Sequence, residues 1–222
     1  MSQITKITSI KKITHDVLRI RFEKPNGYQY IPGQAADIAI NQTEWKDQLS
    51  CFTFTSLPED KHLEFTIKTY PERNRVTNQL LSAKVGDELI LKDPFGDIRS
   101  NGPGVFIAGG AGITPFIAII KVLEKENELN SSKLLFANKM KKDIIDRDYF
   151  EKVLGNNFIN ILSDEKVEGY EYGFVTAELI KKYAEDGPKK FYLCGPPPMM
   201  KAVEKHLASL GIQPSDIIKE GF

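Results

Sequence analysis

Residues 105–115 read VFIAGGAGITP, an apolar run followed by a glycine-rich turn and then by Thr114 and Pro115. A short, wholly apolar run is typical of a strand buried on both faces of a parallel sheet. Glycines let the backbone approach a phosphate closely, and a helix start offers unpaired N–H groups and a partial positive charge. We predict Thr114 as the N-cap and Pro115 as the first residue of a helix. The segment indicates a nucleotide-binding turn or a ligand-free tight turn; without a following Gly-Lys-Ser/Thr it is not a Walker loop.

The second half of the chain alternates between apolar runs of strand length and amphipathic or apolar stretches of helix length. We expect strands at 105–108, 133–137, 158–162 and 191–194, and helices at 114–126, 147–153, 176–183 and 197–210. Such alternation predicts an α/β domain with a doubly wound parallel sheet covered on both faces. Ligands of such sheets bind outside the carboxyl ends of the strands, where the glycine-rich turn falls.

The first half reads instead as short strands separated by turns. We expect strands at 17–22, 36–40, 52–55, 63–68 and 89–91, with one helix that starts near Thr77 and ends before Gly86. This pattern favours a closed or nearly closed antiparallel β-barrel. The loop-rich residues 100–104 separate the halves, so we predict two domains, 1–100 and 101–222.

Composition excludes several classes of protein. Thirty basic residues balance thirty acidic ones, which gives no sign of a nucleic-acid or membrane-surface binder. Two cysteines and three scattered histidines provide no disulfide framework, no iron–sulfur cluster and no metal site. The N-terminus lacks the apolar run of a signal peptide, and no apolar stretch reaches the ~20 residues that span a bilayer. We therefore expect a cytoplasmic protein with reduced thiols.

A second motif, CGPPPMM, begins at Cys194 and follows the last predicted strand. Its prolines make a stiff loop, and Pro197 or Pro198 can start the next helix. Cys194 then lies at a carboxyl strand end, in the same crevice as the glycine-rich turn. The alternative is a buried structural cysteine, the commoner fate of a free cysteine.

Taken in order, the motifs resemble those of the ferredoxin–NADP reductase superfamily of flavoprotein reductases, over essentially the whole chain. The stretches that carry the resemblance are YIPGQ at 30–34, FTFTS at 52–56, VTNQL at 76–80, VGD at 85–87, PFG at 94–96, GGAGITP at 109–115 and CGPP at 194–197.

The resemblance implies a role for each matching position. Thr53 would place its hydroxyl near the reactive nitrogen of a bound flavin, and Phe52 would pack on the flavin ring. Thr77 would cap the helix that holds the flavin diphosphate, and Gly112 and Thr114 would serve the nicotinamide nucleotide. Cys194 would lie beside the nicotinamide carbon that gives up hydride.

The chain ends in Glu220-Gly221-Phe222, which resembles the acidic residue and terminal aromatic ring of many relatives. Phe222 would stack on the flavin and move to admit nicotinamide, or it would belong to a frayed terminus. The catalytic candidates are thus Thr53, Cys194, Glu220 and Phe222. The expected cofactor-binding residues are Phe52, Thr53, Thr55, Ser56, Lys68, Tyr70, Arg75, Val76, Thr77, Gly110, Gly112, Thr114, Pro115, Gly195, Pro196 and Phe222.

Two positions depart from the family pattern. The arginine that usually pairs with the flavin phosphates is Ser50 here, and Arg75 stands where a glycine is common. We hypothesise that Arg75 or Arg73 supplies the missing charge, the alternative being a pair of solvated cations. FAD is the expected cofactor; weak flavin binding, FMN in its place, or loss of flavin are the other interpretations.

The expected activity is transfer of electrons from NAD(P)H through bound FAD to a separate carrier such as ferredoxin or flavodoxin. Lys139, Lys141 and Lys142 favour NADPH if they contact a 2′-phosphate, although they equally suit a solvated loop or a partner contact. The alternatives are an NAD(P)H:flavin reductase that uses free flavin as a substrate and a non-catalytic nucleotide-binding module.

Overall fold

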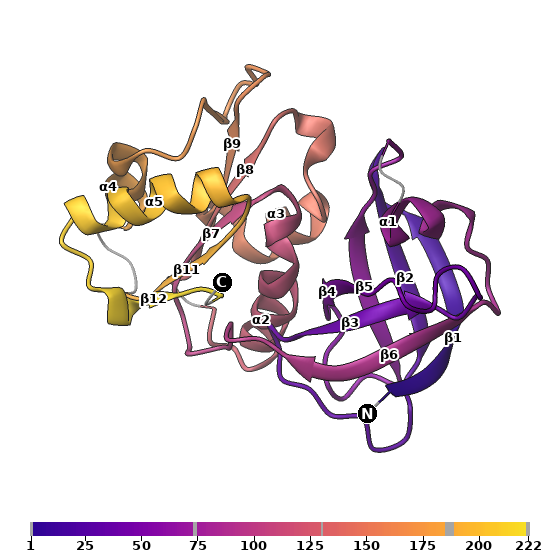
Figure 1. The fold of residues 1–222 in the computed structure, drawn as a ribbon. Helices are drawn as coiled ribbons and strands as arrows, with labels where there is room; N and C mark the ends of the chain where they lie inside the picture. The colour runs from indigo at the N-terminus through magenta and orange to yellow at the C-terminus, as the bar shows by residue number, and fades with distance from the viewer. Residues whose placement is uncertain (1, 73–74, 130, 185–188, 221–222) are drawn as a thin grey trace. The chain divides into compact units, whose positions relative to one another are not determined.

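The computed structural model of this chain describes residues 2–72, 75–129, 131–184 and 189–220. The chain divides into two compact units, residues 1–99 and 100–222, which are described one at a time (Figure 1).

The first unit is an antiparallel β-barrel. Its strands are β1 (Ser2–Lys12), β2 (Val17–Glu23), β3 (Ala35–Ile40), β4 (Ser50–Thr53), β5 (His62–Lys68) and β6 (Glu88–Phe95). They form a six-stranded sheet in the order β4-β3-β6-β1-β2-β5, with every neighbouring pair antiparallel. A bridge between Phe54 and Phe65 brings the two edge strands together and nearly closes the barrel.

Alternate residues of these strands fill the barrel interior, as the period of two requires. Ile20 and Phe22 of β2, together with Phe65 of β5, belong to this core and are fully buried. The helix α1 (Val76–Gln79) and a 3-10 turn (Leu80–Ser82) add Val76 and Leu80 to the same core. The expected barrel is therefore confirmed.

Three local predictions in this unit need correction. The long strand β1 was not expected, although it pairs with both β2 and β6. The helix of the unit is shorter than the predicted one, since α1 ends at Gln79. Thr77 is not its N-cap, because Arg75 occupies that position with extended backbone and Thr77 is the second helical residue.

The second unit is a doubly wound α/β domain, as predicted. Its strands are β7 (Val105–Gly109), β8 (Lys133–Asn138), β9 (Phe158–Leu162), β10 (Glu171–Tyr172), β11 (Phe191–Cys194) and β12 (Ile217–Ile218). Its helices are α2 (Thr114–Lys125), α3 (Arg147–Leu154), α4 (Ala177–Ala184) and α5 (Pro197–Ser209). The sheet is parallel throughout, in the order β10-β9-β8-β7-β11-β12.

Helices cover both faces of this sheet. On one face, Phe116 of α2 contacts Phe106 of β7 with ring centroids 5.3 Å apart, and Phe150 of α3 contacts Phe158 of β9 at 5.4 Å. On the other face, α4 and α5 pack Ile180 and Val203 into a separate apolar cluster. Burial on both faces explains why the central strands read as continuous apolar runs.

Within the described ranges, no helix combines the length and the apolar character needed to cross a membrane.

Candidate functional site

The order of the parallel strands indicates where a ligand would bind in the second unit. From β7 the chain adds β8 and β9 on one side, and it then returns to place β11 on the other side. This reversal creates a topological switch point between β7 and β11, where open α/β sheets bind their ligands. The glycine-rich turn follows β7 and the CGPP loop follows β11, so the fold brings the two predicted motifs together.

The two loops touch through backbone atoms at Gly112. A Cβ atom added there would lie 2.3 Å from the carbonyl oxygen of Cys194 and 2.7 Å from Cα of Gly195. Similarly, a Cβ at Gly109 would lie 2.3 Å from Sδ of Met199. Glycine is therefore required at 112 by the backbone of the neighbouring loop, a reason that the sequence pattern alone did not reveal, whereas at 109 a Cβ would displace the Met199 side chain.

The glycine-rich turn is itself helical. A 3-10 turn over Gly110–Ile113 runs directly into α2, and Gly110 adopts a positive φ of 52° with open space beside it. Neither segment has an acidic residue in its first turn. The positive end of the helix dipole thus points to this loop uncompensated by a first-turn carboxylate, as an anionic phosphate prefers.

The predicted cap of α2 is wrong in detail. Ile113 is the N-cap, Thr114 is the first helical residue and Pro115 follows it. Instead of capping, Thr114 donates its hydroxyl hydrogen to the carbonyl of Ala111 at 3.0 Å. The helical conformation already established over residues 110–113 moves the helix start back along the chain.

Cys194 and Glu220 lie near each other, although 26 positions separate them in sequence. Strand β12 runs beside β11 with Tyr192 opposite Ile218, and the same register carried forward places Glu220 level with Cys194. Burial raises the pKa of the Cys194 thiol to about 12, and the negative charge of Glu220 adds to the shift. Cys194 is therefore a neutral thiol at pH 7 and no nucleophile. Phe222 lies outside the described residues.

The loop after β11 holds the other predicted residues of this motif. Gly195 is half-buried, and Pro196 is the exposed N-cap residue that precedes α5. Met199, in the first turn of α5, packs against both Gly109 and Gly195.

The lysine cluster lies in the loop after β8, among carboxylates. The backbone N–H of Lys141 donates to Glu165 at 2.7 Å, and the N–H of Met140 donates to Asp143 at 2.9 Å. The ammonium group of Lys141 lies over the ring of Tyr170, 5.7 Å from its centroid. Lys139 and Lys142 are both exposed, and the carboxylates of Asp143 and Glu165 beside them give the loop mixed charge rather than a purely basic patch.

In the first unit, the barrel is open along the seam between β4 and β5. In the described part of the chain, no ladder joins Ser50–Thr53 to β5, although Phe54 bridges to Phe65 just beyond. Continuing the antiparallel register from that bridge places Phe52 opposite Ile67 and Ser50 opposite Thr69. This open part of the seam is the candidate flavin site.

Predicted flavin residues come to the seam from both sides. Phe52 and Thr53 of β4 are half-buried, and the ring centroid of Phe52 lies 5.9 Å from that of Phe65. Lys68 and Tyr70, at and after the end of β5, are also half-buried. The ammonium group of Lys68 already pairs with Asp16 at 2.8 Å.

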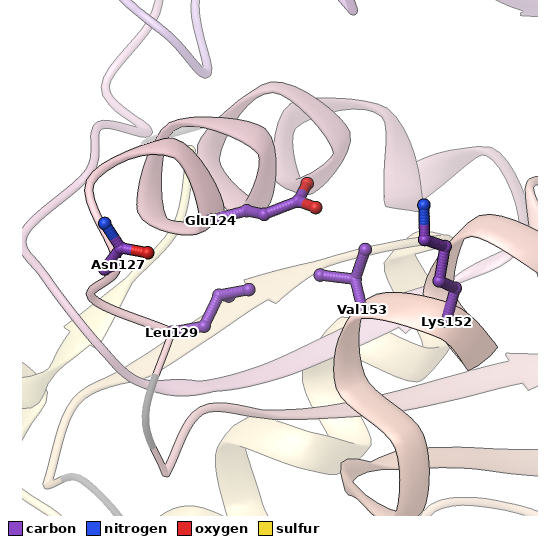
Figure 2. Close-up of a pocket in the computed structure, with 5 residues that line it drawn as sticks. All are labelled: Glu124, Asn127, Leu129, Lys152 and Val153. Atoms are coloured by element: carbon purple, nitrogen blue, oxygen red, sulfur yellow. The ribbon is translucent and has the colours of Figure 1, made fainter.

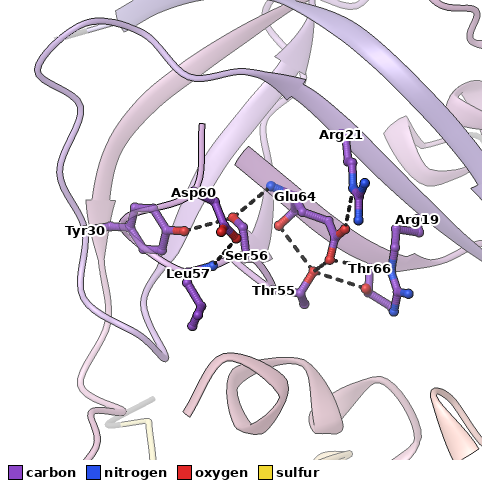
Figure 3. A network of polar contacts seen from close by, with 9 residues as sticks. All are labelled: Arg19, Arg21, Tyr30, Thr55, Ser56, Leu57, Asp60, Glu64 and Thr66. Atoms are coloured by element: carbon purple, nitrogen blue, oxygen red, sulfur yellow. Dashed lines mark hydrogen bonds and ion pairs between the residues drawn. The ribbon is translucent and has the colours of Figure 1, made fainter. Parts of the chain in front are cut away.

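Thr55 and Ser56 do not line the seam as expected. They are 0% and 1% exposed, so their side chains offer no surface to a cofactor. Both hydroxyls instead bond within the protein, Thr55 to Glu64 at 3.0 Å and Ser56 to Tyr30 at 2.8 Å (Figure 3). We expected direct contact with the cofactor, but from Phe54 onward the chain pairs with β5, which encloses these two residues.

The first residues of α1 are suited to a phosphate. Arg75 is exposed at the N-cap position, no side chain caps the helix, and no acidic residue stands in its first turn. Thr77 is half-buried, whereas Val76 is buried in the barrel core. Ser50 is half-buried and carries no charge toward a phosphate. Arg73 lies outside the described residues.

A further hollow of about 330 Å³ lies far from these motifs in the second unit (Figure 2). It is lined by Glu124, Asn127, Leu129, Lys152 and Val153. Glu124 lies in the last turn of α2, Lys152 and Val153 lie in the last turn of α3, and the other two residues follow α2, so the hollow includes none of the predicted site residues. Across the described ranges, no cluster of His, Cys, Asp and Glu side chains could hold a metal ion.

Comparison with known proteins matches both units. A family model described as FAD-binding domain covers residues 2–136, more than half of the chain, and one described as Oxidoreductase NAD-binding domain covers residues 106–205. A curated relative from Pseudomonas putida is the naphthalene 1,2-dioxygenase system ferredoxin–NAD(P)(+) reductase component, which is 25% identical over 97% of this chain and 67% of its own length. The chain belongs to the ferredoxin–NADP reductase superfamily.

Other members of this superfamily are similar over the same span. NADH-cytochrome b5 reductase 1 from Aspergillus terreus is 33% identical over 90% of this chain and 74% of its own length. The crystal structure of a ferredoxin NADP+ reductase from Neisseria gonorrhoeae with bound FAD and NADP has a TM-score of 0.83, with 19% identity over 100% of this chain and 99% of that one. The chain spans about two thirds of the length of several curated relatives that it matches, with 66% and 63% for two of them.

In this ferredoxin–NADP reductase superfamily member, the residues present fit both FAD and a nicotinamide nucleotide, the two cofactors that its domains imply. The unpaired seam with the half-buried Phe52 ring suits a flat flavin, and the uncapped start of α1 suits its diphosphate. The uncompensated start of the helix over 110–125 suits a nucleotide phosphate. Sequence reasoning missed two residues that support these sites. No local motif marks Glu64, and the CGPPPMM motif includes Met199 without showing that its side chain packs against Gly109.

Proposed function

We propose that this chain is an NAD(P)H-dependent flavoprotein reductase that passes electrons to a separate protein carrier. The observation that carries the proposal is the convergence of two independent motifs at the β7–β11 switch point, where Gly112 meets Cys194. The seam between β4 and β5 supports it, since it gathers Phe52, Thr53, Lys68 and Tyr70.

In this proposal each group of residues has one task. Phe52 packs on the flavin ring, and Thr53 places its hydroxyl near the reactive edge of the ring. The start of α1 and Arg75 bind the diphosphate. In the second unit, Gly110 and Thr114 orient the nucleotide phosphates, and the neutral Cys194 thiol contacts the nicotinamide. Bound FAD would accept the hydride as an electron pair and release electrons singly.

Glu220 is proposed to act beside Cys194, at the nicotinamide end of the site, by keeping the Cys194 thiol neutral. Its carboxylate adds negative charge there, and that charge helps to keep the thiol protonated. Hydride transfer requires that the two rings meet in a dry environment, and it needs no acid–base pair. A neutral thiol suits this requirement better than a thiolate, whose charge would have to be desolvated.

We propose NADH as the preferred donor. Several relatives carry NADH in their names, including NADH-cytochrome b5 reductase 1. The lysines at 139, 141 and 142 suggested NADPH from the sequence, but Asp143 and Glu165 share their loops and bind backbone N–H groups there. A loop of mixed charge attracts the 2′-phosphate of NADPH more weakly than an isolated cluster of lysines would.

The proposed acceptor is a small one-electron carrier protein such as ferredoxin or flavodoxin. One relative is named as the electron transfer component of toluate 1,2-dioxygenase, and another is named as the ferredoxin–NAD(P)(+) reductase component of a naphthalene 1,2-dioxygenase system. A second candidate function is an NAD(P)H:flavin reductase that releases its flavin. The uncharged Ser50, at the position where the family resemblance implies arginine, favours that alternative.

The test is an anaerobic titration of the FAD-reconstituted protein, followed by flavin absorbance in the visible range. We expect rapid bleaching by NADH, with a second-order rate constant for flavin reduction at least about tenfold above that for NADPH, equivalent to about 1.4 kcal/mol. Failure to bind FAD would refute the reductase proposal and leave a non-catalytic nucleotide-binding module. Faster bleaching by NADPH would refute only the choice of donor.

A further inference from the structure

The barrel contains a buried carboxylate, Glu64, that no motif of the flavin or nucleotide sites includes. Glu64 lies within β5 and is 2% exposed. Arg21 of β2 donates to one carboxylate oxygen through Nε at 2.8 Å, and Nε of Arg19 lies 3.5 Å from the other. Burying a carboxylate is costly unless charge and hydrogen bonds compensate it, and here both are present.

The same residue ties down the chain that leaves β4. Glu64 accepts from the Thr55 hydroxyl through its carboxylate at 3.0 Å and from the Thr55 N–H through its carbonyl at 2.8 Å. Its own N–H donates to the Ser56 hydroxyl at 3.0 Å. Figure 3 shows these bonds meeting at Glu64, with Arg21 reaching the carboxylate from the other side.

These contacts lie directly beside the open seam. The Phe54–Phe65 bridge and the Thr55–Glu64 bonds close the barrel at one end of the seam, and Ser50–Thr53 diverges from β5 immediately before them. Only one residue separates Thr53 from the bonded Thr55. The position of the Thr55 anchor therefore sets how far Phe52 and Thr53 stand from β5.

We propose that Glu64, through Thr55, is a positioning residue that sets the width of the flavin seam. The inference rests on the proposed flavin site. It explains why Thr55 and Ser56, next to that site, are enclosed in the protein rather than exposed to a ligand. Buried carboxylate networks of this kind are sensitive to loss of one member, because the remaining polar groups then lack partners.

The test compares two buried threonines of the same barrel. Thr55→Val removes the hydroxyl that binds Glu64. Thr5→Val is the control, because Thr5 of β1 is 2% exposed and its hydroxyl donates to the Glu23 carbonyl at 2.6 Å. Glu64→Gln tests the carboxylate with little change in shape, and Thr55→Ser restores the hydroxyl. For each variant we would measure the melting temperature of the flavin-free protein, the Kd for FAD, and the visible spectrum of bound FAD.

We expect Thr55→Val and Glu64→Gln each to raise the Kd for FAD about tenfold and to shift the flavin absorption band. Thr5→Val should lower the melting temperature comparably but keep Kd and spectrum, and Thr55→Ser should resemble the wild type. The double variant of Thr55→Val and Glu64→Gln should bind no more weakly than either single variant, since both act on one contact. Equal Kd values across all variants, or the same loss in Thr5→Val, would overturn the inference. If the wild type bound no FAD, the proposed function would fail first.

Discussion

Gly112 is the residue on which the proposed nucleotide site depends most directly. Its Cα faces the Cys194 carbonyl so closely that no larger side chain fits. We predict that Gly112→Ala lowers stability by about 1–3 kcal/mol, the usual cost of overpacking, and weakens NADH binding at least about tenfold because the two loops separate. Calorimetric unfolding and a fluorescence titration with NADH would measure both effects.

Gly155 provides the matched control for that substitution. It lies at the end of α3 with a positive φ of 52° and open space around its Cα. Gly155→Ala should cost about 1–3 kcal/mol through backbone strain and leave NADH affinity unchanged. If both variants lost NADH affinity equally, the contact between the loops would not be what shapes the crevice.

Cys194 gives a prediction for pH dependence. Because burial and Glu220 raise the pKa of its thiol to about 12, the reactive thiolate is scarce at neutral pH and increases only as pH approaches that value. Iodoacetamide at pH 7.5 should therefore modify the exposed Cys51 well before Cys194, as measured by peptide mass spectrometry. In Cys51→Ser protein, the Cys194 rate should still be rising above pH 9. Labelling of Cys194 first at neutral pH would contradict the raised pKa.

At the scale of elements, the start of α1 carries the prediction about flavin phosphates. Arg75 is exposed beside an uncapped helix start, whereas Ser50 on β4 is uncharged. A charge-assisted hydrogen bond contributes about 1.5–3 kcal/mol, so Arg75→Ala should raise the Kd for FAD at least about tenfold without changing the melting temperature. When Ser50→Arg is combined with Arg75→Ala, most of the FAD affinity should return, because the new arginine supplies a positive charge to the flavin phosphates from β4.

Lys84→Ala is the control for Arg75→Ala, since it removes an exposed cation of the same barrel away from the helix start. Its FAD affinity should equal that of the wild type. An unchanged Kd in Arg75→Ala would show that Arg75 is a solvated surface cation, and the diphosphate would then depend on the helix N–H groups alone.

At the scale of the whole molecule, retention of flavin distinguishes the two enzyme classes. The open seam joins residues from two strands, and a flavin held between them should dissociate slowly. We predict that FAD co-elutes with the protein during gel filtration in 0.15 M salt at a ratio near one, as measured by absorbance. Loss of flavin together with saturable reduction of added FAD by NADH would instead identify a flavin reductase.

Much of this fold could be predicted from local pattern. The strands Phe158–Leu162 and Phe191–Cys194 agree with the predicted bounds, because apolar runs between polar turns mark buried parallel strands. The motifs around Gly112 and Cys194 also lie at neighbouring strand ends, as the sequence predicted, and there we propose the nucleotide site. Their chemistry depends on residue type and on position at a strand end, both of which the sequence contains.

Other features exist only because distant segments meet. The two-residue strands β10 and β12 are strands through pairing with β9 and β11, and no pattern of two residues can reveal them. The enclosure of Thr55 and Ser56 follows from Glu64 on another strand, and the need for glycine at 112 follows from the carbonyl of Cys194. The sequence by itself thus determined most of the longer elements and indicated the kind of chemistry, since propensity and periodicity are local. Only the tertiary structure decided which side chains face a ligand, because burial and hydrogen-bond partners depend on residues far apart in the chain.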